Sequence, residues 1–353
     1  MALNSNNKTM LFPRLNKIII IFFSIALIIT GIISYRYYSY IFSPNVNQPG
    51  SITIPMGARL EQVIDSLTSK KILINEKAFR WVSKKKKYEE YIKQGRYRVE
   101  KGLNTNSIVN MLISGNQEAI KVTFNNVRFM DQLAGKVSQY FTTDSLTMLQ
   151  HLTDVEVMEK YGFNEQTFQS MFIPNTYEMY WTTTPDKFTE RMKTEYDRFW
   201  NDERKAKAKA IGLSPVEVAT LASIVQEETI KNDEKPIVAG LYLNRLSKGI
   251  LLQADPTIKF ALGDFTIRRV LETYLEIDSP YNTYKYTGLP PGPINFPEIS
   301  SIEAVLNPDK NSFLYMCARE DFSGYHNFAK TLAEHNRNAQ RYQSALNKQK
   351  IWR

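Results

Sequence analysis

The apolar positions of the chain first form one uninterrupted run. Residues 18–35 carry no charge, are dominated by Ile, Leu and Phe, and lie between Lys17 and Arg36. At about 1.5 Å of rise per residue, a helix of this length just crosses the hydrocarbon core of a bilayer. The sequence therefore predicts one membrane-spanning helix near the N-terminus.

The residues that flank this run indicate its orientation. Three basic residues precede the run, Lys8, Arg14 and Lys17, and only Arg36 follows it closely. Tyrosines suited to an aromatic belt at the outer interface stand at its C-terminal end: Tyr35, Tyr37, Tyr38 and Tyr40. This charge bias predicts a cytoplasmic N-terminus. The alternative is a cleaved signal peptide, but small residues at a cleavage site are missing. We therefore interpret residues 1–43 as a cytoplasmic tail and an uncleaved anchor in the inner, cytoplasmic membrane.

After the anchor, short stretches with the apolar periodicity of a strand alternate with stretches that have the periodicity of a helix. Residues 44–50 have the composition of a linker. The predicted elements then follow in this order: strand 51–55, a helix with Leu60, Val63, Ile64 and Leu67 on one face, helix 76–83, strand 94–99, helix 105–113 and strand 119–124. Residues 44–120 are thus predicted to form a small α+β module.

The rest of the chain, 121–353, reads as a larger domain of mixed α/β character. Helical periodicity dominates 131–214, and the aromatic, Pro-containing stretch 171–181 interrupts it as a loop with strand character. The fold class predicted for the whole chain is α+β: an N-terminal transmembrane helix, the small module, and this mixed α/β domain.

Composition narrows the choice of partners. The net charge of +9 and the pI near 9.3 favour an anionic surface or partner. Because the residues after Ser43 should face the outside of the membrane, nucleic acid is not expected to be that partner. The lysine run 84–87 is interpreted as a solvated face near headgroups or anionic wall polymer.

The metal- and sulfur-binding residues are few. Three histidines (His151, His326 and His335) are widely separated, so no metal site and no cofactor are predicted. Cys317 is the single cysteine, which rules out an intramolecular disulfide. It lies in the apolar run 313–318, which is interpreted as a buried strand, so we expect this thiol to be packed in the core.

Two adjacent glutamates lie in a strongly signalled helix. Ser214, Pro215 and Glu217 form a capping box with Pro at the first helical position. A stripe of apolar residues follows, with Glu228 at its edge and Glu227 on the opposite, solvent face. A carboxyl group half-buried against apolar side chains has a raised pKa, as a general acid for glycosidic cleavage requires. The alternative is a boundary glutamate that pairs with a nearby lysine.

Polar and aromatic residues gather further along the chain. Gln253 and Asp255 precede a helix that begins at Asp-Pro, and Asn282 and Tyr284 precede the Pro/Gly loop 288–294. These side chains bind sugars through hydrogen bonds and ring stacking. Such loops are also ordinary connectors, so the motifs alone leave both interpretations open.

Four ordered motifs resemble one family across essentially the whole chain. They are Ala222-Ser-Ile-Val-Gln-Glu-Glu-Thr229, Leu252-Gln-Ala-Asp-Pro-Thr257, Tyr281-Asn-Thr-Tyr284 with the loop 288–294, and His326-Asn-Phe-Ala329 with His335-Asn336. This set is similar to the endolytic murein transglycosylases, the YceG-like family. The resemblance implies a LysM-like module at 44–120, a YceG-like catalytic domain at 121–353, and lytic cleavage within nascent peptidoglycan glycan strands, which would set their length.

The resemblance also implies the residue roles. The family's catalytic glutamate directly precedes the threonine, which corresponds to Glu228; Gln226 stands where the family often carries another glutamate. The resemblance implies a role in substrate binding or positioning for six residues: Gln253, Asp255, Asn282, Tyr284, His326 and Asn327. The implied partners are glycan strands and the peptidoglycan synthesis machinery. The alternatives are a muramidase-type hydrolase that uses Asp255 as its base or nucleophile, and a wall-binding protein without activity.

Overall fold

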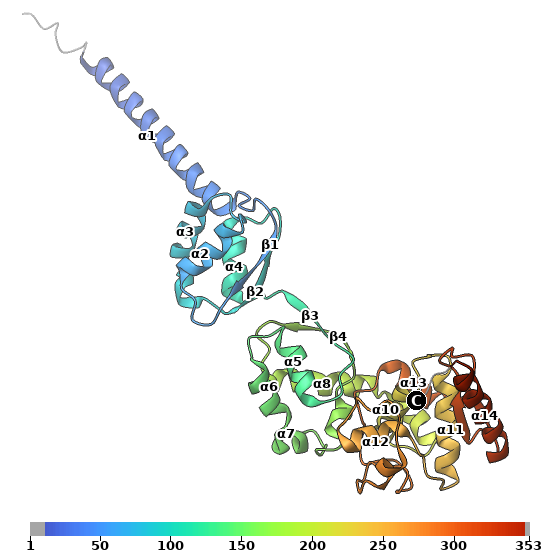
Figure 1. Ribbon diagram of the computed structural model, residues 1–353. Helices are drawn as coiled ribbons and strands as arrows, with labels where there is room; N and C mark the ends of the chain where they lie inside the picture. Colours follow the sequence, from blue (N-terminus) through green and yellow to red (C-terminus); the bar gives the residue numbers. More distant parts are fainter. Residues whose placement is uncertain (1–10, 350–353) are drawn as a thin grey trace, which may run out of the picture. The chain divides into compact units, whose positions relative to one another are not determined.

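The computed structural model describes residues 11–349, so the predicted cytoplasmic tail lies largely outside the described residues. Helix α1 (Leu11–Phe42) contains one segment, Lys17–Phe42, that is long and apolar enough to cross a membrane, with a mean hydropathy of 2.7 (Figure 1). None of this segment is buried within the protein. The predicted apolar helix is confirmed, and it continues beyond Tyr35. Tyr37 and Tyr40 lie against Trp81, with ring centroids 5.1 and 6.3 Å away, so these two tyrosines of the expected belt contact protein.

The chain divides into two compact units. The first comprises residues up to Ile120 with Tyr180–Thr182, and the second comprises Lys121–Met179 and the residues from Thr183 onward. After α1, the first unit contains β1 (Gly50–Ile54), α2 (Leu60–Ser69), α3 (Glu76–Lys85), a 3-10 turn (Tyr88–Tyr91), β2 (Gly95–Val99) and α4 (Thr105–Ser114). The alternation of strands and helices predicted from periodicity is confirmed here.

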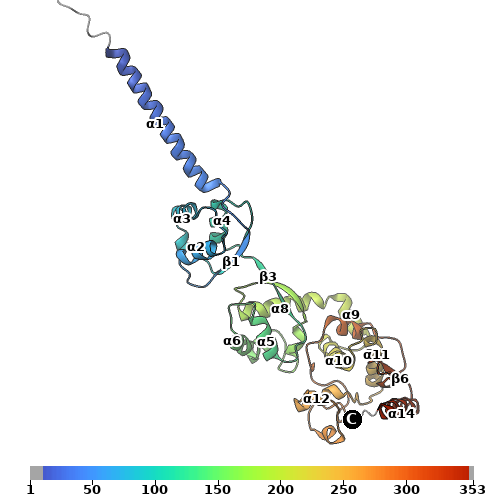
Figure 2. The same cartoon turned by 45° about the horizontal axis from the view of Figure 1, so that its top comes forward.

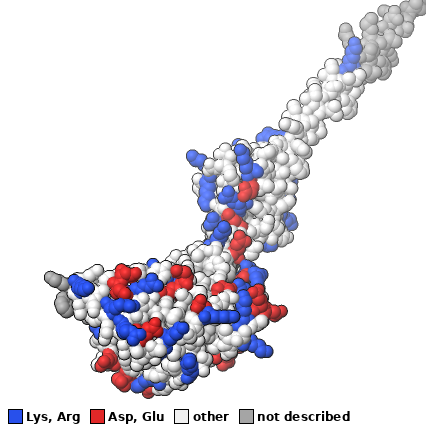
Figure 3. Space-filling model, turned by 90° about the vertical axis from the view of Figure 1, so that its right-hand side faces the viewer, with Lys and Arg blue, Asp and Glu red and all other residues white. Residues whose placement is uncertain are grey.

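Strands β1 and β2 pair antiparallel, with Ile52 opposite Tyr97. Both side chains are fully buried and pack with Val63, Ile64 and Leu67 of α2, the face that the sequence pattern marked as apolar. The lysine run lies at the end of α3, where Lys87 has a left-handed backbone with φ of 52°. On the face seen in Figure 3, several Lys and Arg side chains gather on this unit.

The second unit begins with a mainly helical part. Its elements are β3 (Ala119–Phe124), which the first unit shares, α5 (Met130–Ser138), α6 (Ser145–Leu152), α7 (Val155–Lys160), a 3-10 turn (Phe168–Met171), β4 (Asn175–Tyr180), α8 (Pro185–Phe199) and α9 (Asp202–Ala210). Strand β4 falls in the stretch predicted as a loop with strand character, and it pairs with β3.

The remaining elements begin with helix α10 (Pro215–Glu228), against which several of the later helices pack. The elements after it are α11 (Lys235–Ser247), α12 (Asp255–Leu262), a 3-10 turn (Glu272–Glu276), α13 (Ile299–Leu306), β5 (Tyr315–Ala318), β6 (His326–Ala329) and α14 (Leu332–Lys348). Helices α11, α12 and α13 pack against α10, and Figures 1 and 2 show α11 and α12 beside it. Strands β5 and β6 form an antiparallel pair.

The burial of α10 differs from the expected apolar stripe. Every residue from Val218 to Val225 is buried, because α9, α11, α12 and α13 pack around the helix on several sides. Its polar members are satisfied locally: Thr220 donates to the carbonyl of Val216 at 2.9 Å, and Ser223 donates to that of Thr220 at 2.7 Å. A helix enclosed in this way holds its last residue in a fixed position.

Candidate active site

Glu228 is the last residue of α10. The helix begins with the predicted capping box, in which Ser214 and Glu217 bind each other's backbone N–H groups, and Pro215 follows the cap. It ends because Thr229 adopts an extended backbone, with φ of −146° and ψ of 135°. The Glu228 side chain is therefore at the helix end, half-buried, and lines a cavity of about 340 Å³.

The surroundings of Glu228 favour its neutral form. The pKa of this carboxyl is raised from 4.5 to about 7; burial is the main cause, and the negative charge of Asp255 contributes to the rise. Two groups act in the opposite direction: the Tyr242 hydroxyl, which donates to Glu228 Oε1 at 2.6 Å, and the positive charge of Lys259 both lower the pKa. A carboxyl group with a pKa near 7 can both give and take a proton at neutral pH.

The cavity collects side chains from segments that are distant in sequence. These segments are α10, α11, the turn before α12 with its first residue, the Tyr284 loop, β5, β6 and α14. The residues that line the cavity are Glu228, Leu241, Tyr242, Arg245, Leu252, Gln253, Asp255, Tyr284, Tyr315, Met316, Cys317, Ala318, His326 and His335. Among the described residues, no group of three or more His, Cys, Asp and Glu is arranged to hold a metal ion. The chemistry available here is that of carboxyl, phenol, imidazole, guanidinium and amide groups.

Four of the predicted binding residues lie in this cavity with Glu228. Asp255 is the first residue of α12, and Tyr284 donates its hydroxyl to Asp255 Oδ1 at 2.6 Å. Gln253 has a left-handed backbone, with φ of 52°, which is strained for a residue other than glycine. Its N–H binds the carbonyl of Thr283 at 3.0 Å, and its side-chain oxygen accepts from Arg245. These bonds hold Gln253 in a conformation that the chain alone would disfavour.

His326, the fourth of these residues, is held by a buried carboxylate. Glu234 is 2% exposed, and its two oxygens accept from the His326 backbone N–H at 2.7 Å and contact His326 Nδ1 at 2.8 Å. Thr229 also donates to Glu234 at 2.9 Å. Thr229, the residue directly after α10, is thereby linked through Glu234 to the His326 imidazole on β6.

Two of the predicted binding residues are not among those that line the cavity. Asn282 is fully buried, donates to the carbonyls of Leu275 and Ile277 at 2.8 and 2.7 Å, and accepts from the Tyr284 N–H at 2.9 Å. It therefore shapes the loop that carries Tyr284. Asn327 donates to Glu320 at 2.7 Å, on a neighbouring turn.

Sequence reasoning missed several lining residues. Tyr242 and Arg245 come from α11, and Arg245 donates to the carbonyls of Leu251 and Leu314 at 2.8 and 2.9 Å. An arginine within the apolar pattern of α11 was a signal for a buried polar role. Tyr242 had no such signal, because a tyrosine in a helix is usually a packing residue.

The expectation for Cys317 is correct for the strand and wrong for its burial. The residue lies on β5, but it is half-buried and lines the cavity, because β5 and β6 form the wall of the site and not its core. Burial raises the pKa of its thiol, so the reactive thiolate is disfavoured.

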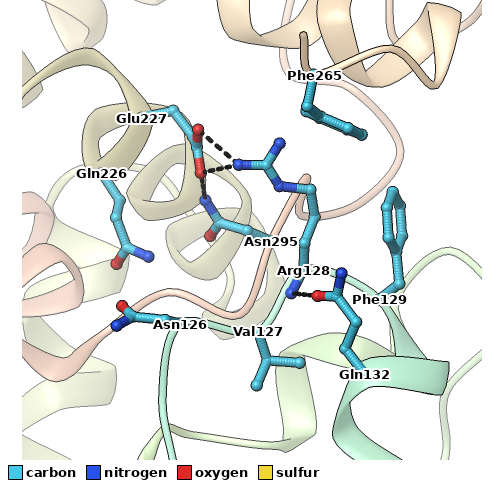
Figure 4. Close-up of a pocket in the computed structure, with 9 residues that line it drawn as sticks. All are labelled: Asn126, Val127, Arg128, Phe129, Gln132, Gln226, Glu227, Phe265 and Asn295. Atoms are coloured by element: carbon cyan, nitrogen blue, oxygen red, sulfur yellow. Dashed lines mark hydrogen bonds and ion pairs between the residues drawn. The ribbon is translucent and has the colours of Figure 1, made fainter.

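The residues before Glu228 face other partners. Glu227 lies on the solvent side of the helix, as expected, but its side chain is only about one-quarter exposed. Both carboxylate oxygens accept from Arg128 at 2.9 Å, and Oε1 accepts from Asn295 at 2.7 Å (Figure 4). Gln226 accepts from the Glu298 N–H at 2.6 Å and from Ser301 at 3.1 Å. Of these three consecutive residues, only Glu228 lines the cavity described above.

Two substitutions should move the pKa of Glu228 in opposite directions. Tyr242→Phe removes the hydrogen bond that lowers this pKa, so we expect it to rise. Asp255→Asn removes the negative charge that raises it, so we expect it to fall; each change should be up to about one pH unit. Infrared titration of the protonated-carboxyl band, with Glu228→Gln as the blank, measures both. Shifts in the same direction would contradict the assigned contacts.

Known proteins resemble this chain over most of its length. The model of a family described as the YceG-like family matches residues 52–341. The endolytic murein transglycosylase of Bacillus subtilis (strain 168) is 31% identical over 315 residues, which cover 84% of this chain and 86% of that protein. The endolytic murein transglycosylase of Streptococcus pneumoniae serotype 2 (strain D39) is 26% identical, over 94% of this chain and 66% of its own length.

A solved structure is also similar. The crystal structure of a yceG-like protein from Listeria monocytogenes aligns with a TM-score of 0.53 and 28% identity. The alignment covers 82% of this chain and 99% of the Listeria chain.

Proposed function

This chain belongs to the YceG-like family, and we propose that it is an endolytic murein transglycosylase that cuts peptidoglycan glycan strands at internal MurNAc–GlcNAc bonds, so setting strand length. The observation that carries this proposal is Glu228, a carboxyl group with a pKa near 7 at the wall of a polar cavity. The resemblance to relatives named for this activity, over 84% and 94% of the chain, supports the choice of substrate.

The proposed reaction uses Glu228 twice. The protonated carboxyl gives its proton to the oxygen that links MurNAc to GlcNAc, and the bond from that oxygen to C1 of MurNAc breaks with oxocarbenium character. The resulting carboxylate takes the proton of the C6 hydroxyl of the same MurNAc. The C6 oxygen then bonds to C1, which gives a 1,6-anhydro end and restores the protonated Glu228.

This sequence of steps requires no nucleophilic carboxylate and no activated water. Glu228 ends the reaction in the protonation state in which it began, because the proton that it gives to the leaving oxygen is replaced by the proton from the C6 hydroxyl. A single group must act first as acid and then as base, and a pKa near 7 lets it hold or release the proton with similar ease.

Other residues would bind or position the strand. Gln253, Asp255, Tyr284 and His326 line the cavity with Glu228 and offer hydrogen-bond donors and acceptors to sugar hydroxyls. We propose indirect roles for Asn282 and Asn327: their hydrogen bonds hold the Tyr284 loop and the turn beside β6.

The location of the enzyme follows from α1. We propose that α1 is an uncleaved single-pass anchor with its N-terminus in the cytoplasm, which leaves the residues after it on the outer side of the membrane. The α+β module after it is proposed to be LysM-like and to contact glycan. A membrane-held enzyme of this kind would meet nascent strands beside the machinery that synthesises them.

The products of the reaction test the proposal. The full-length protein in detergent is incubated with uncrosslinked glycan strands, and the fragments are analysed by mass spectrometry. We expect internal fragments that end in 1,6-anhydro-MurNAc. Reducing ends, heavier by one water, would indicate a muramidase-type hydrolase and direct attention to Asp255. Intact strands that remain bound would indicate a wall-binding protein.

A further inference from the structure

A second cavity, of about 390 Å³, lies beside α10 in the same unit (Figure 4). It is lined in part by Gln226 and Glu227, which directly precede Glu228, yet it shares no lining residue with the cavity of Glu228. Figure 4 shows three amide side chains on one side of this space, Gln226, Asn126 and Asn295, and the rings of Phe129 and Phe265 on the other.

Asn295 carries a buried acceptor without a partner. The residue is 2% exposed, and its Oδ1 makes no hydrogen bond. Its Nδ2 donates to the carbonyl of Ser223 at 3.2 Å and to Glu227 Oε1 at 2.7 Å. Rotating the amide by half a turn would set Oδ1 against these two acceptors, so the orientation is fixed. A buried acceptor of this kind is costly unless a donor reaches it, and a ligand with an O–H or N–H group can supply that donor.

The charges of the cavity cancel within it. Arg128 binds both oxygens of Glu227 at 2.9 Å, and both side chains are about one-quarter exposed. The guanidinium also lies over the ring of Phe265, 3.8 Å from its centroid. With its one cation already bound to its one anion, the cavity offers no net charge to a ligand, which favours a neutral polar molecule over a carboxylate or an ammonium group.

The aromatic side of the cavity continues as a row of ring contacts. Phe265 and Phe129 meet at 5.6 Å, Phe129 stacks on Phe260 at 6.0 Å, and Phe260 contacts Tyr281 at 4.6 Å. Rings of this type give an apolar face on which a sugar ring can lie.

We propose that this second cavity binds an N-acetylhexosamine residue of the glycan strand, away from the bond that is cut. An acetamido group carries one N–H donor and one carbonyl acceptor. The donor fits Asn295 Oδ1, and the acceptor fits the side-chain amide of the exposed Asn126. The hydroxyl groups of the sugar fit the Glu227 carboxylate, and its apolar face fits the aromatic side of the cavity. This inference rests on the proposed function for the identity of the strand.

A blocking substitution with a matched control tests the inference. Gln132 is exposed at the rim, and its side chain accepts from the Arg128 N–H at 2.9 Å. Gln132→Trp fills the cavity, whereas Gln132→Ala loses the same hydrogen bond and leaves the cavity open. Both are made in full-length Glu228→Gln protein, so that strands stay intact, and calorimetry measures binding of murein glycan oligosaccharides without stem peptides. We expect Gln132→Trp to weaken binding by about tenfold or more and Gln132→Ala to stay within about threefold of the parent.

The outcomes separate this inference from the proposed function. Equal binding by the two Gln132 variants, or no binding by the Glu228→Gln parent, would overturn the inference even if wild-type protein produces anhydro ends. Weakened binding by Gln132→Trp alone supports the inference, even if wild-type protein leaves the strands uncut. In active protein, Gln132→Trp should raise KM for glycan strands and leave the anhydro product unchanged. A general loss of folding would not raise KM while leaving the product the same.

Discussion

Glu228→Gln should lower the rate of glycan cleavage by about 10² to 10⁴-fold, the usual contribution of a general acid–base group. Glutamine keeps the size of the side chain and can still accept from the Tyr242 hydroxyl, which lies 2.6 Å from Glu228 Oε1. It cannot donate a proton to the leaving oxygen or take one from the C6 hydroxyl. Because both steps depend on the same group, the loss should appear in kcat and not only in KM.

Glu217→Gln is the matched control on the same helix. Glu217 is exposed and closes the capping box at the start of α10 by accepting from the Ser214 N–H at 2.7 Å. Glutamine can make the same bond. The control should therefore keep wild-type activity in an assay of anhydro ends released over time. Comparable activity of Glu228→Gln and wild type would exclude Glu228 as the acid/base.

The same substitution should change how the free energy of unfolding depends on pH. The pKa of Glu228 is about 7 in the folded protein and 4.5 as its ordinary value, so the folded state holds this proton more tightly. Wild-type stability should therefore be greatest below pH 4.5, as far as this group is concerned, and fall as pH rises toward 7. Above pH 7 this loss is complete and amounts to up to about 3 kcal/mol.

Glu228→Gln has no proton to lose, so its stability relative to wild type should increase by up to about 3 kcal/mol between pH 4.5 and pH 8. Urea unfolding of full-length protein at the two pH values measures this difference, with Glu217→Gln again as the control. A relative stability that does not change with pH would mean that Glu228 is solvated and that its pKa is ordinary.

The positions of the local elements were predictable from the sequence. Strand 119–124 and the starts of the helices at Glu76, Thr105 and Pro215 agree with the structure, because caps and hydrophobic period act within a few residues. The buried face of α2, with Val63, Ile64 and Leu67, follows from the same local pattern.

The surroundings of each candidate residue were less predictable. Periodicity put Glu228 at the edge of an apolar stripe, whereas the structure encloses α10 among four other helices. Asn282 and Tyr284 stand two positions apart, yet only Tyr284 lines the cavity, since the Asn282 amide is used by three backbone groups of its own loop. No local pattern distinguishes these two uses of a polar side chain.

The sequence by itself determined the apolar N-terminal helix, the alternation of the α+β module and the capped start of α10 at Ser214 and Pro215. These features depend on contacts between near neighbours in the chain. Only the tertiary structure decided that Tyr242 donates to Glu228, that Glu234 holds His326, and that Asn295 leaves an acceptor open beside Glu227. Those contacts join residues up to 92 positions apart, and their geometry is set by how the helices pack.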